Sequence, residues 1–246
     1  MKTVGIIGCG AIGTVIAEAV DKGIVSCDGL VLYDCDVKKA EKLQKRLRVP
    51  SKIVKNVNEM VALKPAVIVE AASQQAVKEY AGKVLSANID LIVMSVGALL
   101  DLKIRSGKIH VPSGAIGGLD AVGNAALAGI DSVVLTTRKN PKILDSGSRV
   151  EKIVFEGSAE EAVKRFPREI NVAAALALAA SPEKVKVRVI SDPKVKRNVH
   201  EIRVQWKYGD MFFRFENEPH PDNPGTSALA AWSGINLLKD VLQKSS

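Results

Sequence analysis

Short apolar runs and amphipathic stretches alternate through the first half of the chain. The runs at 66–71 and 91–96 are almost continuously hydrophobic, as in strands covered on both faces. The stretches between the runs place apolar residues about 3.6 positions apart, the helical period. The expected strands are Val4–Gly8, Leu30–Asp34, Ile53–Val54, Ala66–Ala71 and Leu91–Val96, and the expected helices are Ala11–Lys22, Val37–Leu47, Asn58–Leu63 and Gln75–Ala87. This alternation predicts a Rossmann-type, doubly wound parallel sheet.

The pattern changes after Gly107, which indicates a second domain. Three long strand candidates, at 185–190, 199–206 and 211–216, follow one another with short loops, as in an antiparallel sheet. We therefore expect an α/β chain whose second domain holds a mainly antiparallel open sheet. The expected bounds are 1–108 for the first domain, 109–225 for the second, and about 226–246 for a C-terminal helix.

Three glycines follow the first strand with the spacing G-x-G-x-x-G, at Gly8, Gly10 and Gly13. In dinucleotide-binding folds the first glycine permits a tight turn, the second lets the backbone approach a pyrophosphate, and the third lets the helix pack close to the strand. The diphosphate then meets the N–H groups at the start of the helix, here at Ala11 and Ile12. The sequence thus predicts a dinucleotide site; glycines kept only for packing are the alternative.

A carboxylate ends the second expected strand and bears on the choice of cofactor. Asp34 lies 21 residues after Gly13, where it can accept hydrogen bonds from the adenosine ribose hydroxyls. A carboxylate there repels the 2′-phosphate of NADP, whereas the nearby Lys38 and Lys39 partly neutralise that repulsion. We therefore expect a preference for NAD with some use of NADP.

Small residues lie at the ends of the fourth and fifth strands, where ligands bind in this class of fold. The two segments are Glu70-Ala-Ala-Ser73 and Ser95-Val-Gly-Ala98. We expect Ala72, Ser73 and Gly97 to let the backbone approach the nicotinamide ribose. Plain strand-to-helix turns are the alternative.

Composition excludes several classes of protein. The 246 residues carry a net charge of +8, which suits anionic ligands. Aromatic residues make up 4%, and none interrupts the basic stretch at 38–48, so a nucleic-acid platform is not expected. All three cysteines precede residue 36 and form no C-x-x-C pair, which argues against a metal site or a disulfide scaffold. No signal peptide or long apolar span is evident, so we expect a cytoplasmic enzyme rather than a membrane protein.

Four segments of the second half are together similar to those of the L-aspartate dehydrogenase family, and the resemblance spans essentially the whole chain. They are Ser113-Gly-Ala-Ile-Gly-Gly-Leu-Asp120, Phe166-Pro-x-x-x-Asn171-Val-Ala-Ala, Asp192-Pro with Asn198-Val-His-Glu-Ile202, and Asn223-Pro-Gly-Thr-Ser227. The resemblance implies NAD(P)-dependent conversion of L-aspartate to iminoaspartate, a precursor for NAD synthesis. It also implies a homodimer and a last helix that packs back onto the nucleotide domain. Hand-over of iminoaspartate to quinolinate synthase is possible in such an enzyme.

The chemistry itself asks for a group that moves a proton near neutral pH, and histidine suits this task. The chain has three histidines. His200 begins a strand and matches the active-site histidine of the family, although a strand-end histidine that only bonds backbone is the alternative. His220, in the proline-rich turn, is the reserve candidate, and His110 lies in an expected strand near the domain crossover.

The resemblance also assigns binding residues. It implies that Ala115 faces the nicotinamide carboxamide and that the Asn171 amide contacts the cofactor, with a helix N-cap as the alternative role of Asn171. Thr226 and Ser227 are expected to start the last helix and bind a substrate carboxylate there, or else to act as simple caps. Asn198 is the remaining substrate-binding candidate.

Two positions depart from the family pattern. Glu169 stands where an asparagine is expected, and Gly225 stands where a lysine could help hold a substrate carboxylate. The second departure bears on which carboxylate contacts this chain can make.

Other reductases share such a nucleotide-binding half. A semialdehyde dehydrogenase needs a cysteine nucleophile in the second domain, and a dihydrodipicolinate-reductase-like enzyme is expected to have paired histidines; the chain has neither. A homoserine-dehydrogenase-like enzyme remains the main enzymatic alternative. The alternative from another class is a regulatory module that senses NAD(H) without turnover. No DNA-binding helix-turn-helix segment is evident in the sequence, which weakens this alternative.

Overall fold

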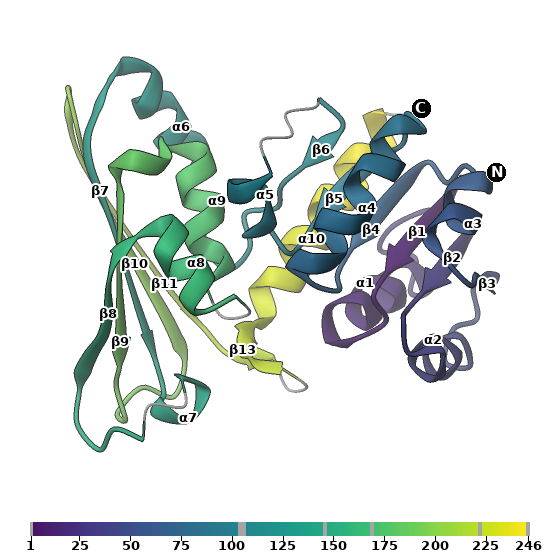
Figure 1. The fold of residues 1–246 in the computed structure, drawn as a ribbon, viewed down its shortest axis with the longest axis horizontal. Coiled ribbons are helices and arrows are strands. Elements are labelled where there is room, and N and C mark those ends of the chain that lie inside the picture. The colour runs from purple at the N-terminus through teal and green to yellow at the C-terminus, as the bar shows by residue number, and fades with distance from the viewer. Residues whose placement is uncertain (1, 103–106, 145–146, 168–169, 221–222, 245–246) are drawn as a thin grey trace. The chain divides into compact units, whose positions relative to one another are not determined.

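Two compact units make up the chain in the computed structural model, which describes residues 2–102, 107–144, 147–167, 170–220 and 223–244. The first unit comprises residues 1–112 and 231–246, and the second comprises residues 113–230. Figure 1 shows both as layers of helix and sheet. None of the helices in the described ranges combines the length and the apolar character needed to cross a membrane.

The first unit is built on a six-stranded sheet in which every neighbouring pair is parallel. The strand order β3-β2-β1-β4-β5-β6 is that of a doubly wound nucleotide-binding sheet, as predicted. The strands are β1 (Thr3–Ile7), β2 (Gly29–Tyr33), β3 (Ser51–Ile53), β4 (Val67–Glu70), β5 (Asp90–Val93) and β6 (Ile109–His110). The helices are α1 (Ala11–Asp21), α2 (Val37–Gln44), α3 (Val57–Ala62), α4 (Gln74–Ser86), α5 (Ala98–Asp101) and most of α10 (Ala228–Lys244).

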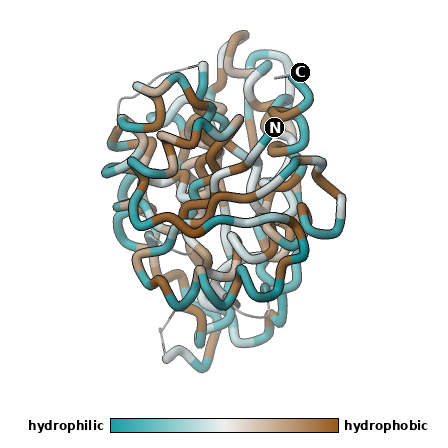
Figure 2. The backbone as a smooth tube through the Cα atoms, turned by 90° about the vertical axis from the view of Figure 1, so that its right-hand side faces the viewer, coloured by the Kyte–Doolittle hydropathy of each residue, from teal (hydrophilic) through white to brown (hydrophobic). Residues whose placement is uncertain are grey.

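The core of the first unit lies between the sheet and its helices. Ile6 on β1 and Ile16 on α1 are fully buried in one apolar cluster, which also contains Ile235 and Leu238 of α10. A side chain at Gly234 would come within 2.7 Å of the Met94 sulfur, so α10 lies close to the end of β5. Figure 2 shows hydrophobic strand segments inside and alternating hydrophobic and hydrophilic positions along the outer helices.

The second unit has a five-stranded sheet in the order β11-β10-β7-β9-β8. Only β7 and β9 are parallel among its neighbouring strands, so the sheet is mainly antiparallel, as predicted. The strands are β7 (Ile130–Lys139), β8 (Lys152–Ser158), β9 (Val185–Ser191), β10 (Asn198–Trp206) and β11 (Gly209–Asn217). The helices are α6 (Leu119–Ala128), α7 (Pro141–Leu144), α8 (Ala159–Arg165) and α9 (Asn171–Ala179), followed by a 3-10 turn, Pro182–Lys184.

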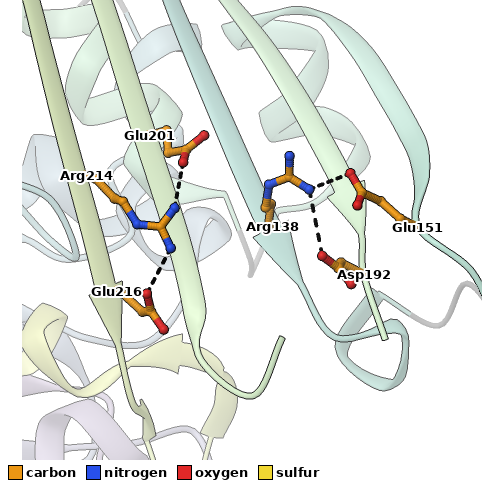
Figure 3. Close-up of polar contacts among 6 residues, drawn as sticks. All are labelled: Arg138, Glu151, Asp192, Glu201, Arg214 and Glu216. Carbon is orange, nitrogen blue, oxygen red and sulfur yellow. Dashed lines mark hydrogen bonds and ion pairs between the residues drawn. The ribbon is translucent and has the colours of Figure 1, made fainter. Parts of the chain in front are cut away.

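The two faces of this second sheet differ. Helices α6, α8 and α9 lie on one face (Figure 1), against inward-facing residues such as Leu135 and Ile202, which are fully buried. Residues of opposite parity carry ion pairs on the other face. Arg214 contacts Glu201 and Glu216 at 2.7 and 2.9 Å, and Arg138 contacts Glu151 and Asp192 at 2.6 and 3.7 Å (Figure 3).

The segment before the last helix differs from the prediction. It forms a two-stranded hairpin, β12 (Pro219–His220) and β13 (Asn223–Ser227), and α10 begins only at Ala228. The Ala228 N–H donates to the Glu218 carbonyl at 3.1 Å, which closes the base of the hairpin. The expectation that Thr226 and Ser227 start the last helix is therefore wrong. The prolines suggested a loop, but prolines are also compatible with such edge strands.

Candidate active site

The glycine loop after β1 has a geometry that side chains would block. Gly8 has a φ of +95°, and a Cβ there would lie 2.7 Å from the Ala71 carbonyl oxygen. A Cβ on Gly13 would collide with the Gly8 carbonyl, so α1 packs on the loop only because glycine is present. Gly10 precedes α1, and a Cβ there would meet no described atom within 4 Å. The loop is thus a cradle open to a ligand at Gly10.

The first turn of α1 follows this cradle directly. Gly10 is the N-cap residue and makes no side-chain cap, so no capping side chain occupies the N–H groups at Ala11 and Ile12. N–H groups at a helix N-terminus bind phosphate well, because they point outward and carry the positive end of the helix dipole. The residues present therefore fit a dinucleotide pyrophosphate.

Asp34 follows β2 and is joined to the same loop. Its Oδ2 accepts a hydrogen bond from the Cys9 N–H at 2.7 Å, and its Oδ1 accepts one from the Asp36 N–H at 2.9 Å. Burial, followed by the charge of Asp34, raises the pKa of the Cys9 thiol to about 12, so this thiol is protonated and unreactive. The carboxylate is held in place beside the cradle, where a ribose would lie in this fold.

The other candidates in the first unit lie after β4 and β5. Ala72 and Ser73 are exposed in the turn that starts α4, where Ser73 Oγ accepts from the Ala76 N–H at 3.2 Å and so caps the helix. Gly97 is buried in the turn before α5. Both turns are tied to the buried carboxylate of Glu70, which ends β4. Sequence reasoning placed Glu70 at this strand end but assigned it no role.

His200 lies on the helix-covered face of β10 and is only 2% exposed. Its Nδ1 lies 3.0 Å from the Thr137 hydroxyl on β7, the strand paired with β10. Burial, and next the positive charge of Lys139, lowers the pKa of His200 to about 3. The imidazole is therefore neutral at physiological pH.

Lys139 is the functional candidate that sequence reasoning missed. It ends β7 and is 1% exposed, which is rare for a lysine. From Val133 to the end of β7 the buried side chains are those at every second position, namely Val133, Leu135, Thr137 and Lys139. The alternation that starts at Val133 and continues to Lys139 is the sequence signal that could have found this residue.

An asparagine on β11 links the glycine-rich turn to this end of the sheet. Asn198 is fully buried at the start of β10, opposite Asn217 on β11. The Asn217 side-chain amide donates to the Ala115 carbonyl at 3.0 Å, and a Cβ on Gly117 would lie 3.4 Å from the Phe215 ring. Ala115, Asn198 and His200 are thereby brought to the same end of one sheet, as a common site requires.

The other predicted binding residues of the second unit lie in helix α9 and in the hairpin strand β13. Asn171 is the first residue of α9 and Ile170 is its N-cap, so the alternative role of Asn171 as an N-cap is wrong. Ser227 is 3% exposed, and its hydroxyl has no hydrogen-bond partner among the described residues. Thr226 precedes it in β13, as does Gly225, whereas Glu169 lies outside the described residues.

The two other histidines have different surroundings. His110 is on β6 of the first unit, with its Nε2 2.6 Å from Asp90. His220 is 6% exposed in β12, in the hairpin of the second unit. Neither shares the β7–β10 pairing that joins His200 to Thr137.

Comparison with known proteins agrees with this arrangement. Residues 120–241 match the family model "Aspartate dehydrogenase, C-terminal", and residues 8–108 match "Homoserine dehydrogenase, NAD binding domain". The chain is 43% identical to an L-aspartate dehydrogenase of Methanothermobacter thermautotrophicus, over 98% of this chain and 96% of that one. It is 40% identical to that of Methanosarcina mazei, over 98% and 97%.

Solved structures show the same fold. The crystal structure of aspartate dehydrogenase from Thermotoga maritima superposes with a TM-score of 0.76 at 29% identity, covering 99% of this chain and 96% of that one. A myo-inositol dehydrogenase of Lactobacillus casei, solved with NAD(H) and myo-inositol, has a TM-score of 0.61 at 10% identity, covering 100% and 86%, and shares the fold alone. The near-complete coverage of relatives at about 40% identity settles the family. The chain belongs to the L-aspartate dehydrogenase family.

Proposed function

We propose that this protein oxidises L-aspartate to iminoaspartate with NAD(P), and that the imine then hydrolyses to oxaloacetate and ammonia. The observation that carries the proposal is the pair of buried side chains, His200 and Lys139, on neighbouring strands of one sheet, in a chain whose other unit holds an open glycine cradle. A dicarboxylate substrate would bring negative charge beside the buried cation of Lys139, and a buried charge favours an opposite charge next to it.

The first unit is proposed as the NAD(P)-binding domain. When bound, the nicotinamide supplies a hydride acceptor, and the protein holds and orients it. The residues proposed to hold the cofactor are Gly8, Gly10, Ala11, Ile12, Gly13, Asp34, Ala72, Ser73 and Gly97, with Ala115 and Asn171 from the second unit. The cradle at Gly8 and Gly10 and the fixed carboxylate of Asp34 support this assignment.

The second unit is proposed as the substrate and catalytic domain. Lys139 pairs with one carboxylate of aspartate, while Asn198, Thr226 and Ser227 offer polar groups for the other. The buried Ser227 hydroxyl supports this role, because a buried polar atom without a partner costs free energy that a ligand can recover. Lys139 gives this chain a cation even though Gly225 provides none.

His200 is proposed to accept the proton that the substrate amine loses. A neutral imidazole has a lone pair for that proton, and Thr137 fixes the ring through Nδ1. A substrate carboxylate beside Lys139 offsets the charge that lowers the His200 pKa, so we expect the basicity of the imidazole to rise when aspartate binds. Loss of this proton frees the nitrogen lone pair to form the C=N bond, and the Cα hydrogen leaves with its electron pair as a hydride to a bound nicotinamide.

A substrate panel tests the proposal. Formation of NADH is followed with L-aspartate, D-aspartate, L-glutamate and homoserine, for the natural chain and for His200→Asn, which can keep the contact with Thr137. Turnover confined to L-aspartate, reduced about 10²- to 10⁴-fold in the variant with unchanged NAD affinity, is expected. Turnover of homoserine alone would favour the alternative suggested by the first-unit match, and NAD binding without any turnover would favour a sensing module.

NAD is proposed as the preferred cofactor, with some use of NADP. The Asp34 carboxylate, fixed by the N–H groups of Cys9 and Asp36, repels a 2′-phosphate. Asp34→Asn should therefore shift the ratio of NADP to NAD affinity toward NADP by at least about tenfold. Asp28→Asn, which neutralises a carboxylate just before the same strand, is the matched control and should leave the ratio unchanged. An unchanged ratio in Asp34→Asn would contradict the assignment.

The location of the enzyme, its oligomeric state and the use of its product belong to the same proposal. We propose a cytoplasmic homodimer that associates through the second unit, whose helix-free sheet face carries the Arg–Glu pairs of Figure 3. Its product is proposed to feed NAD biosynthesis, with iminoaspartate passed to quinolinate synthase before it hydrolyses. Sedimentation equilibrium at low and high salt tests the dimer; a monomer under both conditions would contradict it.

A further inference from the structure

Glu70 is a completely buried carboxylate at the end of β4, with 1% of its surface exposed. Its Oε1 accepts hydrogen bonds from the N–H groups of Ala72 and Ser73 at 2.8 and 2.9 Å, and from the Ser95 hydroxyl at 2.9 Å. Its Oε2 accepts from the Ser95 N–H at 3.0 Å. Burying a carboxylate costs free energy, and packing alone does not account for a buried carboxylate with four hydrogen-bond donors.

The bonding pattern fits the ionised form of Glu70. Three of the four donors are backbone N–H groups, which cannot accept a proton from a carboxylic acid. Burial outweighs the hydrogen bonds from Ser95, Ala72 and Ser73 and raises the pKa of this carboxyl above its ordinary value, so it is the geometry of the donors that supports the ionised form. The four donors together replace the water that a carboxylate loses on burial.

These bonds join separate loops at the ligand-binding edge of the sheet. Ala72 and Ser73 follow β4, whereas Ser95 follows β5, so one carboxylate holds two neighbouring strand ends. The glycine loop packs against the first of these loops, since a Cβ on Gly8 would lie 2.8 Å from the Ala72 Cα, but none of the four hydrogen bonds to Glu70 comes from it. The positions of the loops after β4 and β5 therefore depend on the same buried group.

We propose that Glu70 is a positioning residue that locks the loops after β4 and β5 into the surface on which the nicotinamide half of the cofactor lies. The inference rests on the proposed NAD(P)-dependent function. Glu70 acts through Ala72, Ser73 and Ser95 and does not itself touch the cofactor. The adenosine half is held by the glycine cradle and Asp34, and thus does not depend on Glu70 to the same degree.

The test compares two ligands on Glu70→Gln. Glutamine keeps the shape, but its NH₂ group would face the Ser95 N–H, donor against donor, and the charge is lost. Dissociation constants are measured by calorimetry for NAD and for ADP, which lacks both the nicotinamide and its ribose. We expect NAD to bind at least about tenfold more weakly, with ADP affinity changed less than about twofold.

Two further variants keep the test decisive. Ser95→Ala removes the hydroxyl bond to Glu70 and should weaken NAD binding by a smaller factor, again without affecting ADP. Asp90→Asn is the matched control, because it neutralises a carboxylate at the opposite end of β5 that pairs with Lys108 and His110. It should leave both affinities unchanged.

The outcomes separate this inference from the proposed function. Equal weakening of NAD and ADP in Glu70→Gln would show a general structural role, and unchanged affinities would show that Glu70 is not needed; either would overturn the inference. If Glu70→Gln does not fold, Ser95→Ala decides by the same criterion. Failure of the natural chain to bind NAD would overturn the proposed function as well.

Discussion

At the scale of single residues, the buried His200 makes stability depend on pH. Its pKa is about 3 in the folded protein against an ordinary value of 6.5, so below pH 6.5 the unfolded chain binds a proton that the folded protein does not. The free energy of unfolding should therefore fall as the pH drops below 6.5, by up to about 1.4 kcal/mol per pH unit from this group.

Urea unfolding at about pH 7 and about pH 5 checks this linkage. The natural chain should lose more stability between the two values than His200→Asn, which has no imidazole to protonate in the unfolded state. Equal losses in the two proteins would show that His200 is not held neutral.

Lys139 is the residue whose role the sequence pattern concealed. Lys139→Met keeps a long side chain but removes the charge, so it should raise the KM for L-aspartate by at least about tenfold while leaving NAD affinity unchanged. It should also raise the His200 pKa, because the lysine charge is one cause of the depression. NMR titration of the histidine and steady-state kinetics provide the two measurements.

A matched control exists on the neighbouring strand. Lys186 is an exposed lysine on β9, and Lys186→Met should change neither the KM nor the His200 pKa. If Lys139→Met behaved like this control, the assignment of Lys139 to the substrate carboxylate would be wrong.

At the scale of elements, the contact between α1 and β1 depends on one glycine. A Cβ at position 13 collides with the Gly8 carbonyl, so Gly13→Ala should lower the free energy of unfolding by about 1–3 kcal/mol and weaken NAD binding. Gly82→Ala is the control: Gly82 is exposed inside α4 with no described atom within 4 Å of an added Cβ. It should instead stabilise the protein by about 0.5–1 kcal/mol.

Denaturant unfolding and calorimetry on the two alanine variants supply the comparison. If Gly13→Ala were as stable as the natural chain and bound NAD equally well, the close packing of α1 on the glycine loop would not be required.

Most elements could be predicted because burial imposes a simple pattern on them. The strands of the first unit read as apolar runs, since helices cover both faces of a parallel sheet. Two other regions were harder to predict: β12 and β13 consist largely of a proline-rich stretch that suggests a loop, and the central strand β7 ends in a lysine. Propensity does not identify such elements, because pairing across the hairpin and burial of Lys139 are tertiary effects.

The candidate site was predictable where a motif has a local geometric reason. Gly8 and Gly13 are required by the turn itself, and His200 stood out among three histidines. The roles argued for Glu70 and Lys139 arise only from what surrounds them in space, namely four donors around one and a buried imidazole beside the other. The order of residues along the chain shows neither the donors around Glu70 nor the imidazole beside Lys139.

At the scale of the whole molecule, the central claim is that the hydride of an aspartate Cα–H bond passes to the nicotinamide. The most direct measurement uses L-aspartate carrying deuterium at Cα, with NAD and the complete protein, and mass spectrometry of the reduced cofactor. The account predicts one deuterium in each reduced nicotinamide and none transferred from labelled D-aspartate. Reduced cofactor without the label, or no reduction with L-aspartate while NAD binds, would contradict it.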